Sequence, residues 1–198
     1  MKAILKNIIF ILSVILISPF IIIYKVISII DKSDQPFASF SQLLSLLPGK
    51  TGNYLRASFY FFCMQHCEKD CVISFLSIFA QQATELESGV YIGPGCNIGL
   101  SSIKQNTLLG SGVHIMSGNK QHYITDLNTP IKDQGGCFEK VIIGENCWIG
   151  NSALIMADIG EHSIIGAGSV VVDKIPAFSI AVGNPAKVIQ ARSSTTIG

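Results

Sequence analysis

Two histidines around the middle of the chain have side chains that could act in acid-base chemistry. His122 lies inside a long stretch without repeats, residues 116–140, and His114 lies just before it. Because imidazole titrates near neutral pH, it can take the proton of a hydroxyl group that acts as a nucleophile. His114 and His162 occupy positions of a repeating pattern, which favours structural roles for them. For His122 the alternative to a general base is an exposed loop histidine.

The six cysteines are predicted to be reduced and not catalytic: Cys63, Cys67, Cys71, Cys96, Cys137 and Cys147. The chain is too long and too apolar for a small disulfide-stapled scaffold. The first three have the i, i+4, i+8 spacing of a helix face and could gather a metal with His66. The second pair of a zinc site is missing, so small apolar residues on one helix face are the favoured interpretation and no metal is expected.

Length and charge limit the class of protein. A chain of 198 residues suits one domain with an appendage. Its charged fraction of 14% is low and its formal net charge is +1, so it has no basic face that would indicate nucleic-acid binding.

The amino-terminal part is apolar and is predicted to be helical. Residues 1–30 form a hydrophobic membrane segment in which residues 7–24 lack any charge, which meets the lower limit for spanning a bilayer. Pro19 can kink this segment, so spanning the membrane and lying in its interface both remain open. A cleaved signal peptide is disfavoured, because no small-x-small cleavage site follows the apolar run.

Residues 31–71 are predicted to be a helical lead-in. Phe40, Leu43, Leu44 and Leu47 have the spacing of an amphipathic helix, which Pro48-Gly49 would end. The aromatic residues within 54–62 fit either a membrane-interface belt or packing on the end of the following domain.

An internal repeat dominates the chain from residue 86 onward. Aliphatic residues recur mostly every six positions: Leu86, Ile92, Ile98, Ile103, Leu109, Ile115, Ile143, Ile149, Ile155, Ile159, Ile165 and Val171. Glycine follows in seven of these twelve places, and small side chains collect four residues after the aliphatic. The pattern predicts short strands with inward aliphatic residues, joined at corners where glycine supplies a positive φ.

Three such units would close one triangular coil, and stacked coils would share a continuous core. A period of six is poor for a helix, and alternation typical of a sandwich is missing. We therefore expect a mainly β, parallel β-helix over residues 72–180, with a loop excursion at 116–140 and a tail at 181–198. A structureless excursion of that length usually has a task.

The repeats, the excursion and the closing motifs VVDKIP at 171–176 and GNPAK at 183–187 resemble the hexapeptide-repeat acyltransferases, which include maltose, galactoside, xenobiotic and serine acetyltransferases. The lead-in motifs LPG at 47–49, Leu55-Arg56 and Phe59-Tyr60 are similar to the branch that acetylates bacterial surface polysaccharides. The resemblance implies a left-handed coil, acetyl-CoA as acyl donor, and a homotrimer with active sites between neighbouring subunits.

Site residues follow from the same resemblance. It places the catalytic histidine in the excursion, which identifies His122, although the maltose-type spacing would fall on Lys120; Asp126 could orient it. Contacts with CoA are expected from Asn151, Ala167, Gly168, Asn184 and Lys187, and contacts with the acceptor from Asn97 and Trp148. Transfer is expected to be direct, with backbone N–H groups at the corners available to the oxyanion.

The expected function is O-acetylation of a sugar hydroxyl in a surface polysaccharide or its precursor. Since acyl-CoA is cytoplasmic, the catalytic domain is expected on the cytoplasmic side of the inner membrane. The alternatives are a zinc enzyme like the γ-carbonic anhydrases, which share the prism but need three histidines, and a non-catalytic membrane scaffold.

Overall fold

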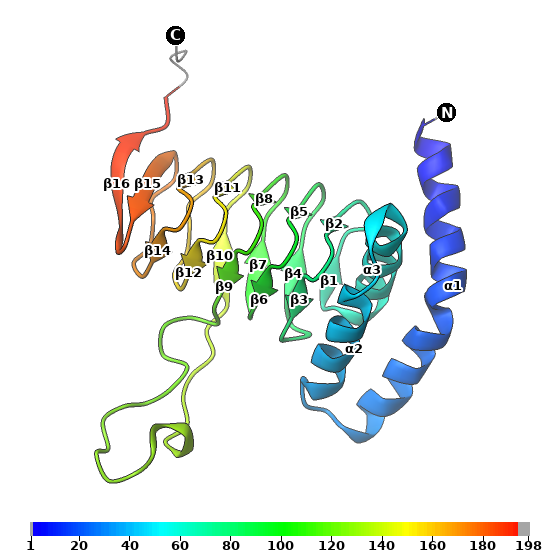
Figure 1. Ribbon diagram of the computed structural model, residues 1–198, viewed down its shortest axis with the longest axis horizontal. Coiled ribbons are helices and arrows are strands. Elements are labelled where there is room, and N and C mark those ends of the chain that lie inside the picture. The colour runs from blue at the N-terminus through cyan, green and yellow to red at the C-terminus, as the bar shows by residue number, and fades with distance from the viewer. Residues whose placement is uncertain (1, 194–198) are drawn as a thin grey trace.

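The molecule is a solenoid with helices stacked on its amino-terminal end and one long loop projecting from its side (Figure 1). The computed structural model describes residues 2–193, with side chains from residue 5 onward. The helices are α1 (Lys2–Ile30), α2 (Gln35–Ser45) and α3 (Gly49–Cys63), and the solenoid follows them directly.

Three sheets form the faces of the solenoid, and their strands are parallel except for the antiparallel pair β15–β16 at the end of sheet B. Sheet A contains β1 (His66–Cys67), β4 (Glu85–Leu86), β7 (Ser101–Ile103) and β10 (Val141–Ile143). Sheet B contains β2 (Val72–Ile73), β5 (Tyr91–Ile92), β8 (Leu108–Leu109), β11 (Trp148–Ile149), β13 (Ile164–Ile165), β15 (Ser179–Gly183) and β16 (Ala186–Ala191). Sheet C contains β3 (Ile78–Phe79), β6 (Asn97–Ile98), β9 (His114–Ile115), β12 (Leu154–Ile155) and β14 (Val170–Val171). The predicted parallel β-helix is confirmed.

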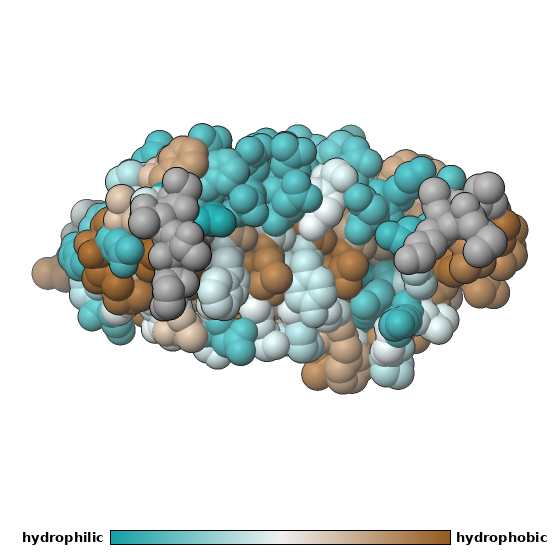
Figure 2. Space-filling model, turned by 90° about the horizontal axis from the view of Figure 1, so that it is seen from above, coloured by the Kyte–Doolittle hydropathy of each residue, from teal (hydrophilic) through white to brown (hydrophobic). Residues whose placement is uncertain are grey.

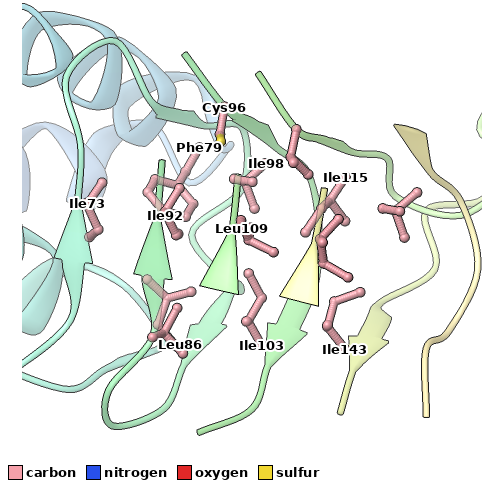
Figure 3. Close-up of a cluster of buried hydrophobic side chains, with 14 of the residues drawn as sticks. Ile73, Phe79, Leu86, Ile92, Cys96, Ile98, Ile103, Leu109, Ile115 and Ile143 are labelled. Atoms are coloured by element: carbon pink, nitrogen blue, oxygen red, sulfur yellow. The ribbon is translucent and has the colours of Figure 1, made fainter. Parts of the chain in front are cut away.

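The inward register matches the six-residue repeat. All twelve predicted aliphatic residues are buried, none more than 2% exposed. In sheet B, Ile92, Leu109, Ile149 and Ile165 are paired in register from coil to coil, and Figure 3 shows how such residues stack along the interior. The short steps of the repeat, such as Ile155 to Ile159, all fall where the chain passes from sheet C to sheet A.

The solenoid begins one coil earlier than the repeat indicated. Cys67, Ile73 and Phe79 are the inward residues of β1, β2 and β3, and all three are buried. The helix ends at Cys63, so the interpretation of Cys67 and Cys71 as residues of one helix face is wrong. The expected boundary at residue 72 already includes β2 and β3, so β1 is the strand that lies ahead of it. The periodic pattern itself was not recognised before Leu86, because cysteine and phenylalanine replace aliphatic residues there and no glycine follows them. At the other end, the β15–β16 hairpin crosses the expected boundary at residue 180.

The glycines after the aliphatic residues have a different purpose from the predicted one. None of the seven has a positive φ. For six of them the positive φ occurs two residues later, for example at Gly95, Gly112 and Gly168. At Gly110 an added Cβ would lie only 2.8 Å from the backbone nitrogen of Asn151 in the next coil. Glycine is needed because successive coils approach each other too closely for a side chain.

The small side chains beside the core also link the coils. The hydroxyl of Ser77 donates to the carbonyl of Gly93, that of Thr107 to Gly144, and the Cys96 thiol to Gly110. These bonds supply partners for corner carbonyls that the strands leave unpaired.

The helices α2 and α3 form a helical cap on the end of the solenoid, and Arg56 joins this cap to the solenoid. Its buried guanidinium donates to the carbonyls of Leu44 and Leu47 and to Ile73 in β2. The Tyr60 hydroxyl lies 2.8 Å from that of Ser41, which accepts the amide of Phe79. The aromatic run of residues 54–62 therefore packs partly on the end of the β-helix.

Candidate active site

The excursion of residues 116–140 leaves the solenoid at the corner between sheets C and A and projects far from it (Figure 1). The sequence had indicated a structureless loop, but the excursion has a regular backbone structure. Its two arms form a ribbon in which Tyr123 donates to Gly135, Cys137 to Lys120 and Glu139 to Ser117. A 3-10 helix, η1 (Ile131–Asp133), lies near the tip.

His122 lies on this ribbon with its side chain exposed. Opposite it, Gly136 comes so close that an added Cβ would overlap the carbonyl oxygen of Gln121 and lie 2.9 Å from the amide nitrogen of His122. The contact fixes the backbone that carries the imidazole, while the ring remains open to a substrate.

Asp126 accepts hydrogen bonds from residues at the loop tip, and these bonds do not involve His122. One carboxylate oxygen accepts the amide of Asn128 at 2.8 Å and the other accepts the Thr129 hydroxyl at 2.6 Å. The hydrogen bond from Thr129, followed by that from Asn128, lowers the pKa of the Asp126 carboxyl. Sequence reasoning missed Gln134, whose amide donates to the carbonyls of Asp126 and Thr129. Its position directly before Gly135-Gly136, a pair that is typical of a turn, was the feature of the sequence that could have indicated this role.

Asn97 and His114 are neighbours on the outer face of sheet C. They are paired in register on β6 and β9, and both are exposed. The chain enters the excursion directly after β9, so this polar pair lies at the base of the loop that carries His122. His162 differs: its ring stacks on Phe178 at 4.9 Å between centroids, and Nδ1 lies 2.9 Å from the Asn146 amide.

Three of the expected CoA contacts share one edge, the corner between sheets B and C. Asn151 follows β11 there, and Ala167 and Gly168 follow β13 one coil later. The amide of Gly168 donates to the Asn151 carbonyl at 2.8 Å, and the Asn151 side chain accepts the amide of Ser111 at 3.0 Å. Ala167 and Gly168 are exposed, so the edge is open to a ligand.

The remaining predicted residues lie on sheet B and beyond it. Trp148 is 54% exposed on the outer face of β11. Asn184 lies in the turn between β15 and β16. Lys187 is the second residue of β16, and its ammonium group is 3.7 Å from an Asp173 carboxylate oxygen. Both of these side chains are largely exposed, so the Lys187 charge is available to another anion.

Within one chain, these residues do not converge on one cavity. The loop that carries His122 leaves the solenoid at the corner between sheets C and A, whereas Asn151 and Gly168 lie at the corner between sheets B and C. A hollow of about 330 Å³ on sheet A contains none of them.

The cysteines of the solenoid are poorly suited to nucleophilic chemistry. Cys96 donates to the Gly110 carbonyl and Cys147 to the Gly160 carbonyl. Burial raises the pKa of both thiols, which disfavours the thiolate.

Among residues 2–193, one group of side chains has the proximity of a metal site, formed by Glu145, Glu161 and His162. The Nε2 of His162 already lies 3.3 Å from a Glu145 oxygen, and Nδ1 faces Asn146. This group contains a single histidine and neither His114 nor His122, unlike the three-histidine site of the zinc alternative.

Part of the sequence is similar to known proteins. The model of the hexapeptide repeat of succinyl-transferase matches residues 140–174. A protein of Mycobacterium tuberculosis, provisionally named as an acetyltransferase, is 42% identical over 73 residues, which are 36% of this chain and 24% of that protein. The chain spans about a quarter to a third of the length of the curated relatives it matches.

Two solved structures share the fold. The maltose O-acetyltransferase from Clostridium difficile 630 has a TM-score of 0.62 at 21% identity, over 81% of this chain and 87% of that chain. A galactoside acetyltransferase in complex with coenzyme A has a TM-score of 0.62 at 18% identity, over 81% of each chain. The chain is therefore a hexapeptide-repeat protein with the β-helix fold of the hexapeptide-repeat acyltransferases.

Proposed function

We propose that this chain is an acetyl-CoA-dependent O-acyltransferase that acetylates a sugar hydroxyl of a surface polysaccharide or its precursor. The observation that carries the proposal is a β-helix shared with sugar acetyltransferases, from which a held loop presents His122 to solvent. The names of the matched relatives support acetyl transfer as the reaction.

His122 is the general base in this proposal. Its neutral imidazole takes the proton of the sugar hydroxyl while the oxygen attacks the thioester carbonyl. The tetrahedral intermediate collapses, the carbon–sulfur bond breaks, and the CoA sulfur leaves with the proton that the imidazolium returns. Backbone N–H groups at the solenoid corners stabilise the oxyanion. The raised pKa of the buried thiols supports direct transfer over a covalent cysteine intermediate.

Acetyl-CoA lies along the corner between sheets B and C in this proposal. The exposed backbone at Ala167 and Gly168, with Asn151 one coil away, suits the extended pantetheine arm. Asn184 and Lys187 lie at the carboxyl-terminal hairpin, where the Lys187 ammonium can meet a nucleotide phosphate. Asn97 and Trp148 contact the acceptor, Asn97 through the amide and Trp148 through its exposed ring.

A homotrimer would complete the site. The loop that carries His122 exposes apolar side chains, including Ile124 at 69%, Leu127 at 96% and Phe138 at 57%. Exposed apolar groups of this density mark an interaction surface. Packing of the loop on a neighbouring subunit would cover them and bring His122 to that subunit's CoA corner.

The proposed location is the inner membrane, with the catalytic domain in the cytoplasm, where acetyl-CoA is available. One helix, over Leu5–Ile30, is long and apolar enough to cross a membrane.

The test is to incubate membranes that contain the protein with radiolabelled acetyl-CoA and to fractionate the glycans. The proposal predicts label in a polysaccharide or precursor fraction, released by mild alkali as expected for an O-ester. Label that requires His122 would also separate an enzyme from a scaffold. Stoichiometric zinc in the purified protein together with bicarbonate dehydration, and no acetyl transfer, would favour the carbonic-anhydrase alternative.

A further inference from the structure

The helix α1 forms the outermost layer at one end of the molecule. It packs on α3 and α2, which in turn pack on β1, β2 and β3 (Figure 1). Along this contact, Ser13, Ile17 and Tyr24 are buried. The Tyr24 ring lies 5.6 to 6.2 Å from three aromatic rings of α2 and α3, and the Phe10 ring lies 5.5 Å from that of Phe61.

The opposite side of α1 is apolar throughout. Its exposed large side chains are Leu5, Ile8, Ile11, Leu12, Ile15, Leu16, Phe20, Ile22, Ile23, Val26, Ile27, Ile29 and Ile30. At 3.6 residues per turn, the polar residues of the helix fall on the packed half or at its border, among them Ser13 and Lys25. Figure 2 shows apolar side chains at the end of the molecule where α1 lies. A face of this size needs an apolar partner.

A recess beside the amino-terminal end of α1 combines apolar walls, which include Phe10 and Val72, with positive charge. It has a volume of about 590 Å³ and is lined by residues that include Lys6, Lys50 and Lys69. The Lys69 ammonium donates to the neutral Asn7 side chain at 3.3 Å. The one acidic residue in the lining, Asp70, accepts the Ser88 hydroxyl. Three ammonium groups against one carboxylate leave an excess of positive charge suited to a phosphate.

We propose that α1 lies in the plane of an anionic bilayer, with its apolar face among the acyl chains and the recess of Lys6, Lys50 and Lys69 occupied by a lipid phosphate. The recess lies between α1 and the cap, hence at headgroup depth when the outer face is about 5 to 10 Å inside the interface. This inference extends the proposed membrane association and is independent of the acyl-transfer reaction.

The packing of α1 argues against a spanning orientation. Contacts with the cap extend from Phe10 to Tyr24, about 21 Å of helix at 1.5 Å per residue, against a hydrocarbon thickness of about 30 Å. Both ends are tied to the same domain, one through Asn7 and Lys69 and the other through Tyr24 and Phe37. A spanning α1 would therefore pull charged groups beside it, such as Lys50 of α3 and Lys69 of the first coil, into the hydrocarbon, which is costly.

Vesicle flotation of the purified full chain tests both parts. Phosphatidylcholine vesicles with phosphatidylglycerol should bind it at least about tenfold more tightly than phosphatidylcholine alone. The double variant Ile15→Asp/Val26→Asp should lose binding to both. Lys50→Gln/Lys69→Gln should lose only the preference for anionic vesicles. The control Ile189→Asp, at an exposed apolar position of the opposite end, should bind as the wild type does.

Orientation is read by labelling protein bound to preformed vesicles. In a Cys137→Ser background, which removes the one exposed native cysteine of the described chain, Lys6→Cys and Lys32→Cys should both react with a membrane-impermeant maleimide. Protection of one of the two would show a spanning helix and overturn the in-plane placement. Flotation that is unchanged by Ile15→Asp/Val26→Asp would also overturn this placement. So would oligomers that form through α1 without binding of the protein to vesicles. A retained anionic preference in the double lysine variant would overturn the phosphate site.

Discussion

Gly136 presses directly on the backbone of Gln121, with no room for a side chain between the two arms of the loop. This contact, together with three backbone hydrogen bonds, sets the position of His122 relative to the solenoid. The two arms of the loop are thereby held together. A general base needs such a fixed position relative to its substrate.

Replacing Gly136 by Ala should displace the His122 arm and leave the solenoid intact. Misplacement of a catalytic group by about 1 Å can reduce the rate on the order of 100-fold. We expect kcat for acetyl transfer to fall by about 10- to 100-fold while the thermal midpoint stays near that of the wild type. Gly135→Asn is the control, because an added Cβ there would meet only Tyr123 Cδ2, at 4.0 Å, and Asn tolerates the φ of +77° at this position. Equal losses in both variants would refute a specific role for the contact.

Arg56→Ala should destabilise the junction between the cap and the solenoid. The substitution removes four hydrogen bonds of a fully buried guanidinium and leaves carbonyls such as that of Ile73 without a partner. The expected cost is about 3 kcal/mol, measured by urea unfolding. Arg192→Ala, at an exposed arginine, should change the free energy of unfolding by less than about 0.5 kcal/mol. Similar urea midpoints for the two variants would contradict the role of Arg56 in holding the cap on the solenoid.

Cys96 should matter through its hydrogen bond and not through reactivity. Cys96→Ser keeps a donor for the Gly110 carbonyl, as Ser77 does one coil earlier, whereas Cys96→Ala loses it. We expect the alanine variant to be less stable than the serine variant by about 1 kcal/mol. Acetyl transfer should persist in both, and loss of turnover in the serine variant with the fold intact would revive a cysteine mechanism.

Acid should weaken the anchor of the excursion loop. The hydrogen bond from Lys140 is the main cause that lowers the pKa of Glu85 below its ordinary value of 4.5. Because the pKa is depressed in the folded state, this stabilisation is fully present above about pH 4.5 and is lost as the pH falls through the lower folded value.

Glu85→Gln should therefore reduce stability at pH 7 by about 0.5 kcal/mol, a modest effect because the ion pair is partly exposed, and should flatten the decline of the urea midpoint below pH 4.5. Glu139→Gln, at an exposed carboxylate, serves as the control. A pH profile identical to that of the wild type would show that the Glu85–Lys140 pair does not contribute.

The repeat was readable from sequence because each inward aliphatic residue, such as Ile92 or Ile149, recurs with the period of the coil. The periodic pattern was not recognised in the first coil, and its strand β1 was left outside the expected domain, because Cys67 and Phe79 serve the core without belonging to the aliphatic set. The reason for glycine at Gly110 could not be read either, since it depends on how closely the next coil approaches.

The candidate site was predicted only by residue type. The sequence indicated a loop with a histidine, but the contacts that hold it, Gly136 on Gln121 and Gln134 on Asp126, join residues 8 to 15 positions apart and depend on a fold of the loop that has no periodic signal. The sequence also left α1 between two orientations, because length and hydropathy are the same for both. Its packing along α2 and α3 is the observation on which the proposed in-plane orientation rests.

The most direct test of the central proposal is to measure acetyl-CoA binding and turnover side by side in the wild type and His122→Ala, with His114→Ala as the matched control. Binding is followed by calorimetry, and turnover by thiol release in the presence of the glycan fraction that accepts label. The account predicts that His122→Ala binds acetyl-CoA with unchanged affinity and loses turnover by about 100- to 10,000-fold, whereas His114→Ala retains most of it. Full turnover in His122→Ala, or no binding of acetyl-CoA by the wild type, would contradict it.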